Sequence, residues 1–425
     1  MFLYTAGWGL LPLMMSKARH DVLFSKGRFG YYDQEISQLG RPRVWFHAAS
    51  VGEVGGAIPI MHRLHNRLQH SSIFLTVSTP QGFHFARTQL PNWAQVLPFP
   101  LDFTQTLERA FKQLQPDIYV ALESEFWPNL YHFLERYRVP AVLLNGRLSK
   151  QSATIYGFLR PLFQPIFGQF QWLAMHSQED RRNVLRLGAK PERTIVLGSS
   201  KYEGLLTRTQ PEKSENWREM LQIRKDTPVM VGGSLRRSEC IDLLKVYRRL
   251  KEIEPHLTAI LAPRHLEQLP NMTNWLDGQN IPFQLLSRLQ NNMEKRHASV
   301  ILVDRIGVLF ELYALGDLVF CGGTMTPIGG HNILEPAAWK KTVFYGPHLQ
   351  KVVCEHRILK TFEGSFVVQN ADDLFRSWSY WIKNLPELKE HGTKALLALE
   401  RLGGVTKKQV ELIVSILSEK TNVHR

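Results

Sequence analysis

Short apolar runs alternate with amphipathic stretches along the chain from residue 43 onwards. In the first half, the apolar runs lie at residues 44–46, 73–77, 118–122, 141–144, 172–175 and 194–197. The stretches between them, such as residues 58–68 and 130–137, repeat their apolar positions with the period of a helix. This alternation is typical of a parallel β-sheet whose two faces are covered by helices.

The alternation begins again after a polar segment at residues 207–215. Its apolar runs lie at residues 229–231, 258–261, 281–283, 300–303, 318–321, 343–345 and 365–368. We predict an α/β fold of two Rossmann-like domains, residues 1–205 and 206–425, that face an open cleft. A helical tail at residues 374–417 is counted with the second domain, although its pattern leaves open which domain it packs on. Ligands of open α/β sheets bind beyond the carboxyl ends of the strands, so the loops after the apolar runs are expected to carry the chemistry.

Composition narrows the class of protein. The chain has 425 residues, of which 44% are hydrophobic and 21% charged, as expected for a globular protein of two domains. Its three cysteines, Cys240, Cys321 and Cys354, are widely separated and form neither a metal-type pair nor a disulfide framework, which favours a reducing compartment. The net charge of +14 predicts an anionic partner: nucleic acid, acidic lipid or a phosphorylated substrate. Nucleic acid is disfavoured, because the sequence shows no zinc finger, RNA-binding signature or long basic arm.

Residues 2–15 are strongly apolar and carry no charge. This stretch is short of the roughly 20 apolar residues that a spanning helix needs. The basic residues Lys17, Arg19, Lys26 and Arg28 follow it. An apolar wedge with a basic flank suits the anionic surface of a membrane that faces the cytoplasm, and a buried first helix is the alternative.

Three loops of the first half carry candidate catalytic residues. Glu53 lies at a predicted helix start after the run at residues 44–46, where a carboxylate can act as a general base, although the helix dipole should lower its pKa. Glu123 and Glu125 follow the run at residues 118–122, with one of them able to face solvent. Lys201 follows residues 194–197 and can meet a phosphate or a carboxylate. The alternatives are an ordinary first-turn glutamate and a surface lysine.

The second half carries a glycine-rich loop at residues 329–336 that reads Gly-Gly-His-Asn-Ile-Leu-Glu-Pro. Glu335 should cap a helix that Pro336 opens, and its carboxylate can accept two hydrogen bonds from a ribose. The bare loop can receive a phosphate. Arg264 follows the run at residues 258–261 and suits bidentate capture of a phosphate, and the main-chain amides of residues 306–308 can hold a ligand.

Taken together, residues 47–53, 123–129, 145–149, 198–201, 263–265 and 329–336 resemble, in this order, the 3-deoxy-D-manno-octulosonic acid (Kdo) transferases of lipid A assembly. The resemblance implies a GT-B glycosyltransferase that moves Kdo from CMP-Kdo to the glucosamine disaccharide of a lipid A precursor. It also implies work at the cytoplasmic face of the inner membrane. The reaction would invert the anomeric centre and need no metal, since no Asp-x-Asp motif occurs in the expected loops.

The resemblance also assigns roles to individual residues. Glu53 would be the general base, and Glu123 and Lys201 would stabilise the transition state. CMP would be bound by Pro263, Arg264, Ile306, Gly307, Val308, Asn332, Ile333, Leu334 and Glu335.

Two segments depart from the family pattern. The usual Ser-Thr-His turn is replaced at residues 233–237 by Gly-Ser-Leu-Arg-Arg, and the usual Met-Gly-Glu by Ile-Gly-Val at residues 306–308. The first alternative is a GT-B enzyme that uses another nucleotide sugar, a UDP-sugar transferase or epimerase, because Glu335 and its loop could hold the ribose of any nucleotide. A nonenzymatic binder of anionic lipid is the second.

Overall fold

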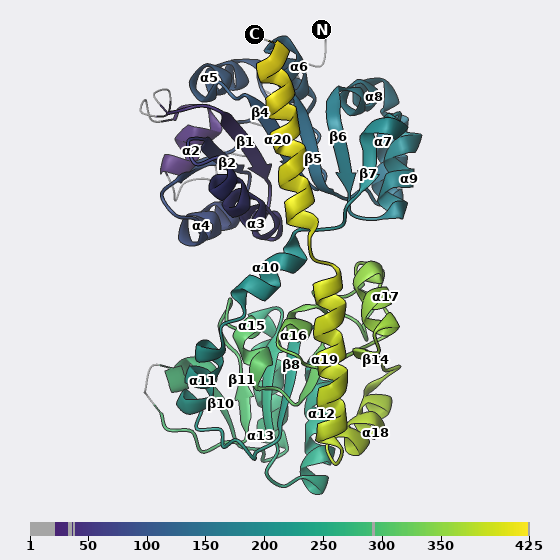
Figure 1. Ribbon diagram of the computed structural model, residues 1–425. Helices are drawn as coiled ribbons and strands as arrows, with labels where there is room; N and C mark the ends of the chain where they lie inside the picture. Colours follow the sequence, from purple (N-terminus) through teal and green to yellow (C-terminus); the bar gives the residue numbers. More distant parts are fainter. Residues whose placement is uncertain (1–21, 33–35, 37–38, 291–293, 424–425) are drawn as a thin grey trace. The chain divides into compact units, whose positions relative to one another are not determined.

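The computed structural model describes residues 22–32, 36, 39–290 and 294–423, which form two compact units (Figure 1). Unit 1 comprises Met1–Gly204 and Gly403–Arg425, and unit 2 comprises Leu205–Leu402. The boundary near residue 205 agrees with the sequence prediction. The assignment of the chain's last residues to the second domain was wrong, because Gly403–Arg425 belongs to unit 1.

Unit 1 is built on a seven-stranded parallel sheet of order β3-β2-β1-β4-β5-β6-β7. Its strands are β1 (Arg43–Ala48), β2 (Ser72–Val77), β3 (Ala94–Pro98), β4 (Ile118–Leu122), β5 (Ala141–Gly146), β6 (Phe170–Met175) and β7 (Thr194–Val196). Its helices are α2 (Val22–Arg28), α3 (Val51–Arg67), α4 (Pro80–Gln89), α5 (Thr104–Leu114), α6 (Pro128–Arg136), α7 (Lys150–Phe158), α8 (Arg160–Gln169), α9 (Gln178–Arg186), η4 (Pro191–Arg193) and α20 (Val405–Val423), and α10 (Lys201–Arg208) runs across the boundary.

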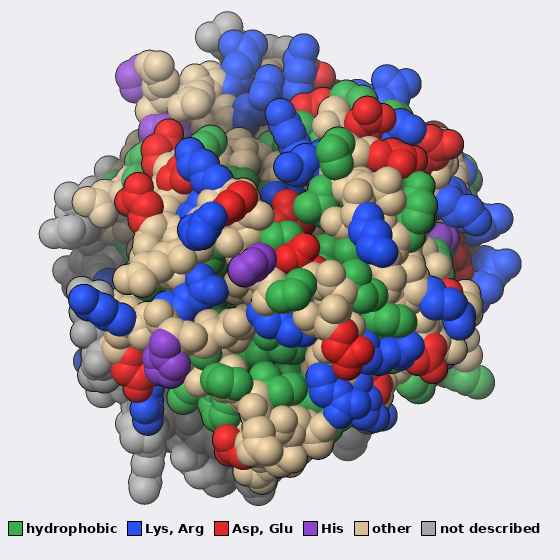
Figure 2. Space-filling view, turned by 90° about the horizontal axis from the view of Figure 1, so that it is seen from below, with side chains coloured by type: hydrophobic (Ala, Val, Ile, Leu, Met, Phe, Trp, Pro, Cys, Tyr) green, Lys and Arg blue, Asp and Glu red, His purple; other side chains and the backbone are tan. Residues whose placement is uncertain are grey.

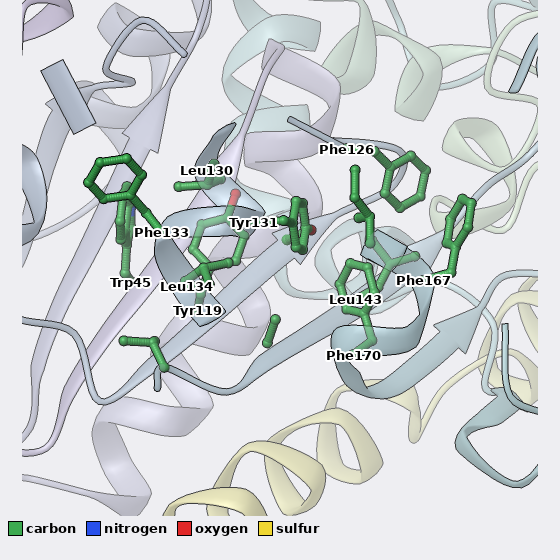
Figure 3. Close-up of a cluster of buried hydrophobic side chains, with 14 of the residues drawn as sticks. Trp45, Tyr119, Phe126, Leu130, Tyr131, Phe133, Leu134, Leu143, Phe167 and Phe170 are labelled. Atoms are coloured by element: carbon green, nitrogen blue, oxygen red, sulfur yellow. The ribbon is translucent and has the colours of Figure 1, made fainter. Parts of the chain in front are cut away.

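The two faces of this sheet bury separate hydrophobic clusters. Successive residues of β1 point to opposite faces, so Trp45 lies in one cluster while Val44 and Phe46 lie in the other. Figure 3 shows the Trp45 cluster, which Tyr119 and Phe133 join from β4 and α6. Burial on both faces explains why these strands read as continuous apolar runs.

Helix α20 belongs to unit 1 because its apolar side lies in the second cluster. Val410, Ile413 and Ile416 are buried there beside residues of α3. Burial of each such side chain contributes roughly 1.5–3 kcal/mol. Gln409, which is also buried, donates a hydrogen bond of 2.9 Å to Asn145 of β5.

Unit 2 repeats the plan with a seven-stranded parallel sheet of order β10-β11-β9-β8-β12-β13-β14. Its strands are β8 (Val229–Leu235), β9 (Thr258–Pro263), β10 (Phe283–Leu285), β11 (Val300–Leu302), β12 (Leu318–Cys321), β13 (Val343–Tyr345) and β14 (Ser365–Val367). Its helices are α11 (Pro211–Met220), α12 (Glu239–Ile253), η5 (Leu266–Gln268), α13 (Leu269–Gly278), α14 (Leu286–Gln290), α15 (Leu309–Leu312), η6 (Tyr313–Leu315), α16 (Glu335–Ala338), α17 (Val353–Thr361), α18 (Ala371–Trp381) and α19 (Leu385–Arg401). The run predicted at residues 281–283 begins as a strand only at Phe283, since Pro282 has no N–H for the ladder.

The N-terminal apolar segment at residues 2–15, with Lys17 and Arg19, lies outside the described residues. Of its predicted basic flank, Arg28 lies in α2 and donates to the Phe99 carbonyl at 2.9 Å. No helix within the described ranges combines the length and the apolar character that crossing a membrane requires.

Candidate active site

The carboxyl ends of β1 and β4 are adjacent at the switch point of the first sheet. The chain leaves β1 for β2 on one side, and β4 lies on the other side of β1. The segments after these strands carry Glu53 and Glu123. Such a switch point is where open α/β sheets bind ligands, so two of the predicted catalytic side chains share one edge of the sheet.

Glu53 occupies the first turn of α3 in a reciprocal capping arrangement. Ser50 is the N-cap, and its hydroxyl oxygen accepts from the Glu53 N–H at 3.4 Å. The Glu53 carboxylate in turn accepts from the Ala49 N–H at 2.8 Å and from the Ser50 hydroxyl at 3.1 Å. The helix start therefore fixes the position of this carboxylate.

Burial raises the pKa of Glu53 to about 7, and the charges of Glu123 and Glu125 add to the rise. The hydrogen bonds from Ala49 and Ser50 act in the opposite direction, because they stabilise the carboxylate. The sequence suggested a lowered pKa from the helix dipole. Desolvation of the mostly buried side chain outweighs that effect.

Glu123 and Lys201 form an ion pair between positions 78 residues apart in the chain. Glu123 adopts a left-handed backbone conformation, with a φ of 58°, which costs a residue with a side chain roughly 1–3 kcal/mol. Its main chain is held there by hydrogen bonds to Leu144 and Arg147. The structure therefore brings the two predicted transition-state residues together.

Lys201 also lies against the first turns of α3, which begin with the predicted base. A Cβ atom added to Gly52 would lie 3.5 Å from the Lys201 Nζ, and one added to Gly56 would lie 3.2 Å from its Cγ. The absence of side chains at these two glycines leaves room for the lysine. Glu53, Glu123 and Lys201 consequently form one cluster in unit 1.

A buried polar network holds the segment that begins with Lys201. The Asn145 Nδ2 donates to the Ser200 hydroxyl at 2.8 Å, and the Asn145 Oδ1 accepts from the Ser200 N–H at 3.0 Å and from Gln409 at 2.9 Å. The Ser200 hydroxyl donates to the Gly56 carbonyl at 2.6 Å. Asn145 thereby joins β5, α3, α20 and the start of α10.

Replacement of Asn145 by alanine is expected to lower the free energy of unfolding by about 2–4 kcal/mol, because two buried donors lose their acceptor. Asn145 also has a φ of 56°, a conformation that alanine adopts poorly. Urea unfolding measures the change. Asn92→Ala, at an exposed position, is the matched control, and an equal stability of the two variants would contradict the role of the network.

Sequence analysis did not assign His47 or a role to Glu125. The His47 ring is buried, with its Nδ1 3.0 Å from the Thr76 carbonyl and its Nε2 3.1 Å from the Glu125 carboxylate. Trp127 Nε1 donates to the same carboxylate at 2.7 Å. Burial tends to raise the pKa of Glu125, but His47 and Trp127 bring it below its ordinary value. The expectation that one carboxylate of this loop faces solvent was wrong, because both are mostly buried and paired.

In unit 2, the loop after β12 lies beside a partly buried Glu335. This residue is the first of α16, with Leu334 as the N-cap and Pro336 next, so the prediction that Glu335 caps the helix was wrong by one residue. Its carboxylate accepts from the Asn332 Nδ2 at 3.3 Å. Burial raises the pKa of Glu335, and the charges of Arg208 and Arg264 oppose the rise.

The other predicted nucleotide-binding residues differ in how much of their side chains is exposed to solvent. Ile333 and Leu334 are fully buried, so only their main chains can contact a ligand. Pro263 ends β9, and Arg264 beyond it is exposed. Ile306 is 84% exposed, and Gly307 has a φ of 95° with open space where a Cβ would lie. Val308 precedes the four-residue helix α15.

Glu239, the first residue of α12, is a second residue that sequence analysis missed. It is fully buried, and its carboxylate accepts four main-chain N–H groups: Arg236 at 2.8 Å, Gly323 at 2.6 Å, Thr324 at 3.0 Å and Met325 at 2.8 Å. These donors lie in the loops after β8 and β12, which are adjacent strands. Glu239 therefore fixes both loops at the switch point of the second sheet.

Basic side chains are scattered over the face in Figure 2 and are interspersed with acidic ones, so the described residues of that face do not form a patch of one sign. Within the described part of the chain, no three His, Cys, Asp or Glu side chains are grouped so that they could hold a metal ion.

Comparison with known proteins decides the family. A family model described as 3-deoxy-D-manno-octulosonic-acid transferase matches residues 25–204. The 3-deoxy-D-manno-octulosonic acid transferase of Haemophilus influenzae is 30% identical over 412 residues, which cover 95% of this chain and 94% of the relative. The chain belongs to the Kdo transferase family. It is accordingly a glycosyltransferase.

Other relatives of this Kdo transferase family member are similar over most of its length. The transferase of Aquifex aeolicus is 29% identical and matches over 84% of this chain and 91% of its own length. A bifunctional glycosyltransferase/methyltransferase of Fusobacterium nucleatum is 30% identical over 81% of this chain, but the match spans only 53% of that longer protein.

Solved structures confirm the predicted GT-B fold. A glycosyltransferase of Rickettsia africae superposes with a TM-score of 0.60 at 13% identity, covering 88% of this chain and 98% of the other. Anabaena Alr3699/HepE in complex with UDP and glucose gives a TM-score of 0.57 at 16% identity, covering 88% of this chain and all of the other. At such identities the likeness concerns the fold alone.

Proposed function

We propose that this enzyme transfers Kdo from CMP-Kdo to the glucosamine disaccharide of a lipid A precursor, with inversion of the anomeric centre. The proposal rests on the Glu53 carboxylate, which lies beside the Glu123–Lys201 ion pair at the switch point of unit 1. Its pKa is raised to about 7. Membership of the Kdo transferase family supports Kdo as the sugar that is transferred.

Glu53 is the general base in this proposal. A base is most effective when its pKa is near the working pH, because it is then largely ionised and still binds a proton well. The carboxylate takes the proton of the acceptor hydroxyl as that oxygen attacks the anomeric carbon. Attack on the face opposite to CMP inverts the configuration.

Lys201 and Glu123 act on charge in the transition state. Fixed charges stabilise developing charge more effectively than water does, because they need no reorganisation. The sugar acquires positive, oxocarbenium-like character as CMP departs, and carboxylates near it are favourable. The ammonium of Lys201 is held by Glu123, so its position is set before the substrate arrives.

CMP is assigned to unit 2. Glu335 and Asn332 would accept or donate hydrogen bonds at the ribose, and Arg264 would meet the phosphate. Protein cations can stabilise a leaving CMP without a metal, and we propose metal-independent turnover.

We also propose that the enzyme works on the cytoplasmic surface of the inner membrane. Side chains at the junction of α7 and α8 support this placement: Phe158 is 84% exposed, Ile155 53% and Leu159 50%. The exposed basic residues Lys150 and Arg160 are the first residues of α7 and α8. Apolar side chains with a basic flank suit an anionic lipid surface, and co-sedimentation with vesicles of anionic lipid checks this part of the proposal.

Mass analysis of the product from CMP-Kdo and a tetraacylated glucosamine disaccharide tests the reaction. Addition of the mass of one or more Kdo residues, with release of CMP, is expected. UDP-glucose and UDP-N-acetylglucosamine serve as alternative donors in parallel reactions. Turnover of a UDP-sugar without turnover of CMP-Kdo would instead favour the other nucleotide-sugar enzymes.

The rate of transfer is expected to rise with pH through a value of about 7, because Glu53 acts only when it is deprotonated. Below this pH, kcat/KM should fall about tenfold for each pH unit. Glu125→Gln removes a negative charge that raises the pKa of Glu53, so the acidic limb should move to lower pH. A flat profile between pH 5 and pH 8 under conditions of rate-limiting chemistry would contradict the assignment.

A further inference from the structure

Positively charged and imidazole side chains converge on the switch point of the second sheet. Arg236 follows β8, His265 follows β9, and His331 lies in the glycine-rich loop after β12; the three strands are adjacent in the sheet. The Arg236 guanidinium contacts the His265 ring directly. None of these three residues is among those assigned to CMP above.

Gly323 leaves the space into which two of these side chains extend. A Cβ added to Gly323 would lie 2.7 Å from the His331 Cδ2 and 3.7 Å from the Arg236 Cγ. Gly323 also has a φ of 73°, which favours glycine. The main chain at Gly323, in the loop after β12, therefore packs directly against the side chains of Arg236 and His331.

The cluster lacks a counter-ion among the described residues. Arg236 Nε and His331 Nε2 are buried and have no hydrogen-bond partner there. The carboxylate of Glu239, which accepts from the Arg236 N–H, is already occupied by four main-chain N–H groups. Buried polar atoms are nearly always paired in folded proteins, so these two atoms indicate a group that arrives from outside the chain.

The residues around His331 indicate the charge of the external group that would pair with Arg236 and His331. Burial lowers its pKa to about 4, and the positive charges of Arg264, Arg236, Lys351 and His265 lower it further. These side chains therefore disfavour another positive charge among them. An anionic ligand would raise the pKa of His331 again, because its negative charge would stabilise the positively charged forms of these side chains.

We propose that Arg236, His265 and His331, with Lys351 at the edge, bind the carboxylate of the donor sugar. The inference rests on the proposed function, in which the donor is CMP-Kdo. That donor carries two anionic groups, and Arg264 with the ribose loop accounts for the CMP part. A guanidinium beside imidazole N–H groups suits the planar carboxylate that remains.

The turn that carries Arg236 departs from the pattern of the family. Arg236 lies in the Gly-Ser-Leu-Arg-Arg turn that replaces the usual Ser-Thr-His of the family. An arginine keeps its positive charge at every working pH and offers more donors than an imidazole. In the proposed site, Arg236 therefore gives this turn a permanent positive charge for the carboxylate of the donor sugar.

Equilibrium titrations with CMP and with CMP-Kdo, in the absence of acceptor, test the inference. Arg236→Ala is expected to weaken binding of CMP-Kdo by about tenfold to a hundredfold, the effect of one charged hydrogen-bonding partner, while binding of CMP changes less than about threefold. Arg237→Ala is the matched control, because this neighbouring arginine is exposed and lies outside the cluster. It should leave both affinities within about twofold.

Two results would overturn the inference without touching the proposed function. An equal loss for CMP and CMP-Kdo in Arg236→Ala would assign the cluster to the phosphate, and no loss for either would leave it without a role in donor binding. His331→Gln, which keeps a side chain of similar size, provides a second test with the same expected selectivity. Failure of the unchanged protein to bind CMP-Kdo more tightly than UDP-glucose would instead contradict the proposed function.

Discussion

Glu53→Gln is expected to lower kcat for Kdo transfer by a factor of about 10²–10⁴, the usual contribution of a positioned general base. Glutamine has the shape of glutamate and an oxygen that can accept from Ala49 or Ser50, so the start of α3 should persist. It cannot take a proton from the acceptor hydroxyl. Affinity for CMP-Kdo and thermal stability should change little, and CMP release in the presence of acceptor measures the loss.

Asp180→Asn is the matched control for this variant. Asp180 occupies the same place in α9 as Glu53 does in α3: it accepts from the Ser177 hydroxyl at 2.5 Å, and its own N–H donates to Ser177 at 3.1 Å. Burial tends to raise the pKa of Asp180, but its hydrogen bonds bring it below its ordinary value, unlike that of Glu53. Retention of transfer by Glu53→Gln, or an equal loss in both variants, would remove Glu53 from the role of base.

Glu239→Gln should destabilise unit 2 by about 2–5 kcal/mol, because one pair of buried N–H groups would face an NH₂ group in place of an oxygen. One oxygen of Glu239 accepts from Arg236 and Gly323, and the other accepts from Thr324 and Met325. Either orientation of the amide leaves two donors unsatisfied. The loops after β8 and β12 should then shift, and binding of CMP-Kdo should weaken with the loss of stability.

Urea unfolding and donor titration measure the two effects of Glu239→Gln. Asp242→Asn, three positions further along α12, is the control, since its carboxylate is partly exposed and pairs only loosely with Lys245 at 3.9 Å. Its free energy of unfolding should change by less than about 0.5 kcal/mol. A Glu239→Gln variant as stable as this control would show that the four hydrogen bonds contribute little.

The sequence predicts the strands of both sheets except β3, because parallel strands buried on both faces must be apolar along their whole length. Strand β3 lies at the edge of its sheet and its middle residues are only partly buried, so it has no continuous apolar run. It also predicts that Glu53, Glu123 and Lys201 each follow a strand of the first sheet, and in the structure they follow β1, β4 and β7. It does not reveal that Glu123 pairs with Lys201, because that contact depends on a left-handed residue and on folding across 78 positions.

Two other features were not accessible from patterns. Glu239 accepts from main-chain N–H groups up to 86 positions away. Because nearly every residue has such a donor, the sequence does not show which residues bind Glu239. The amphipathic pattern of α20 shows which of its faces is buried but not which unit covers it. Only the packing against α3 and the bond from Gln409 to Asn145 decide that.

The division of unit 1 into two chain segments has a consequence for biosynthesis. Residues 205–402 of unit 2 separate α20 from the rest of unit 1 in the sequence. During translation, strands β1 to β7 therefore emerge from the ribosome long before the helix that covers α3 and supplies Gln409. Asn145 therefore acquires its hydrogen bond from Gln409 only after the whole of unit 2 has been synthesised. The segment that holds Lys201 is completed at the same stage.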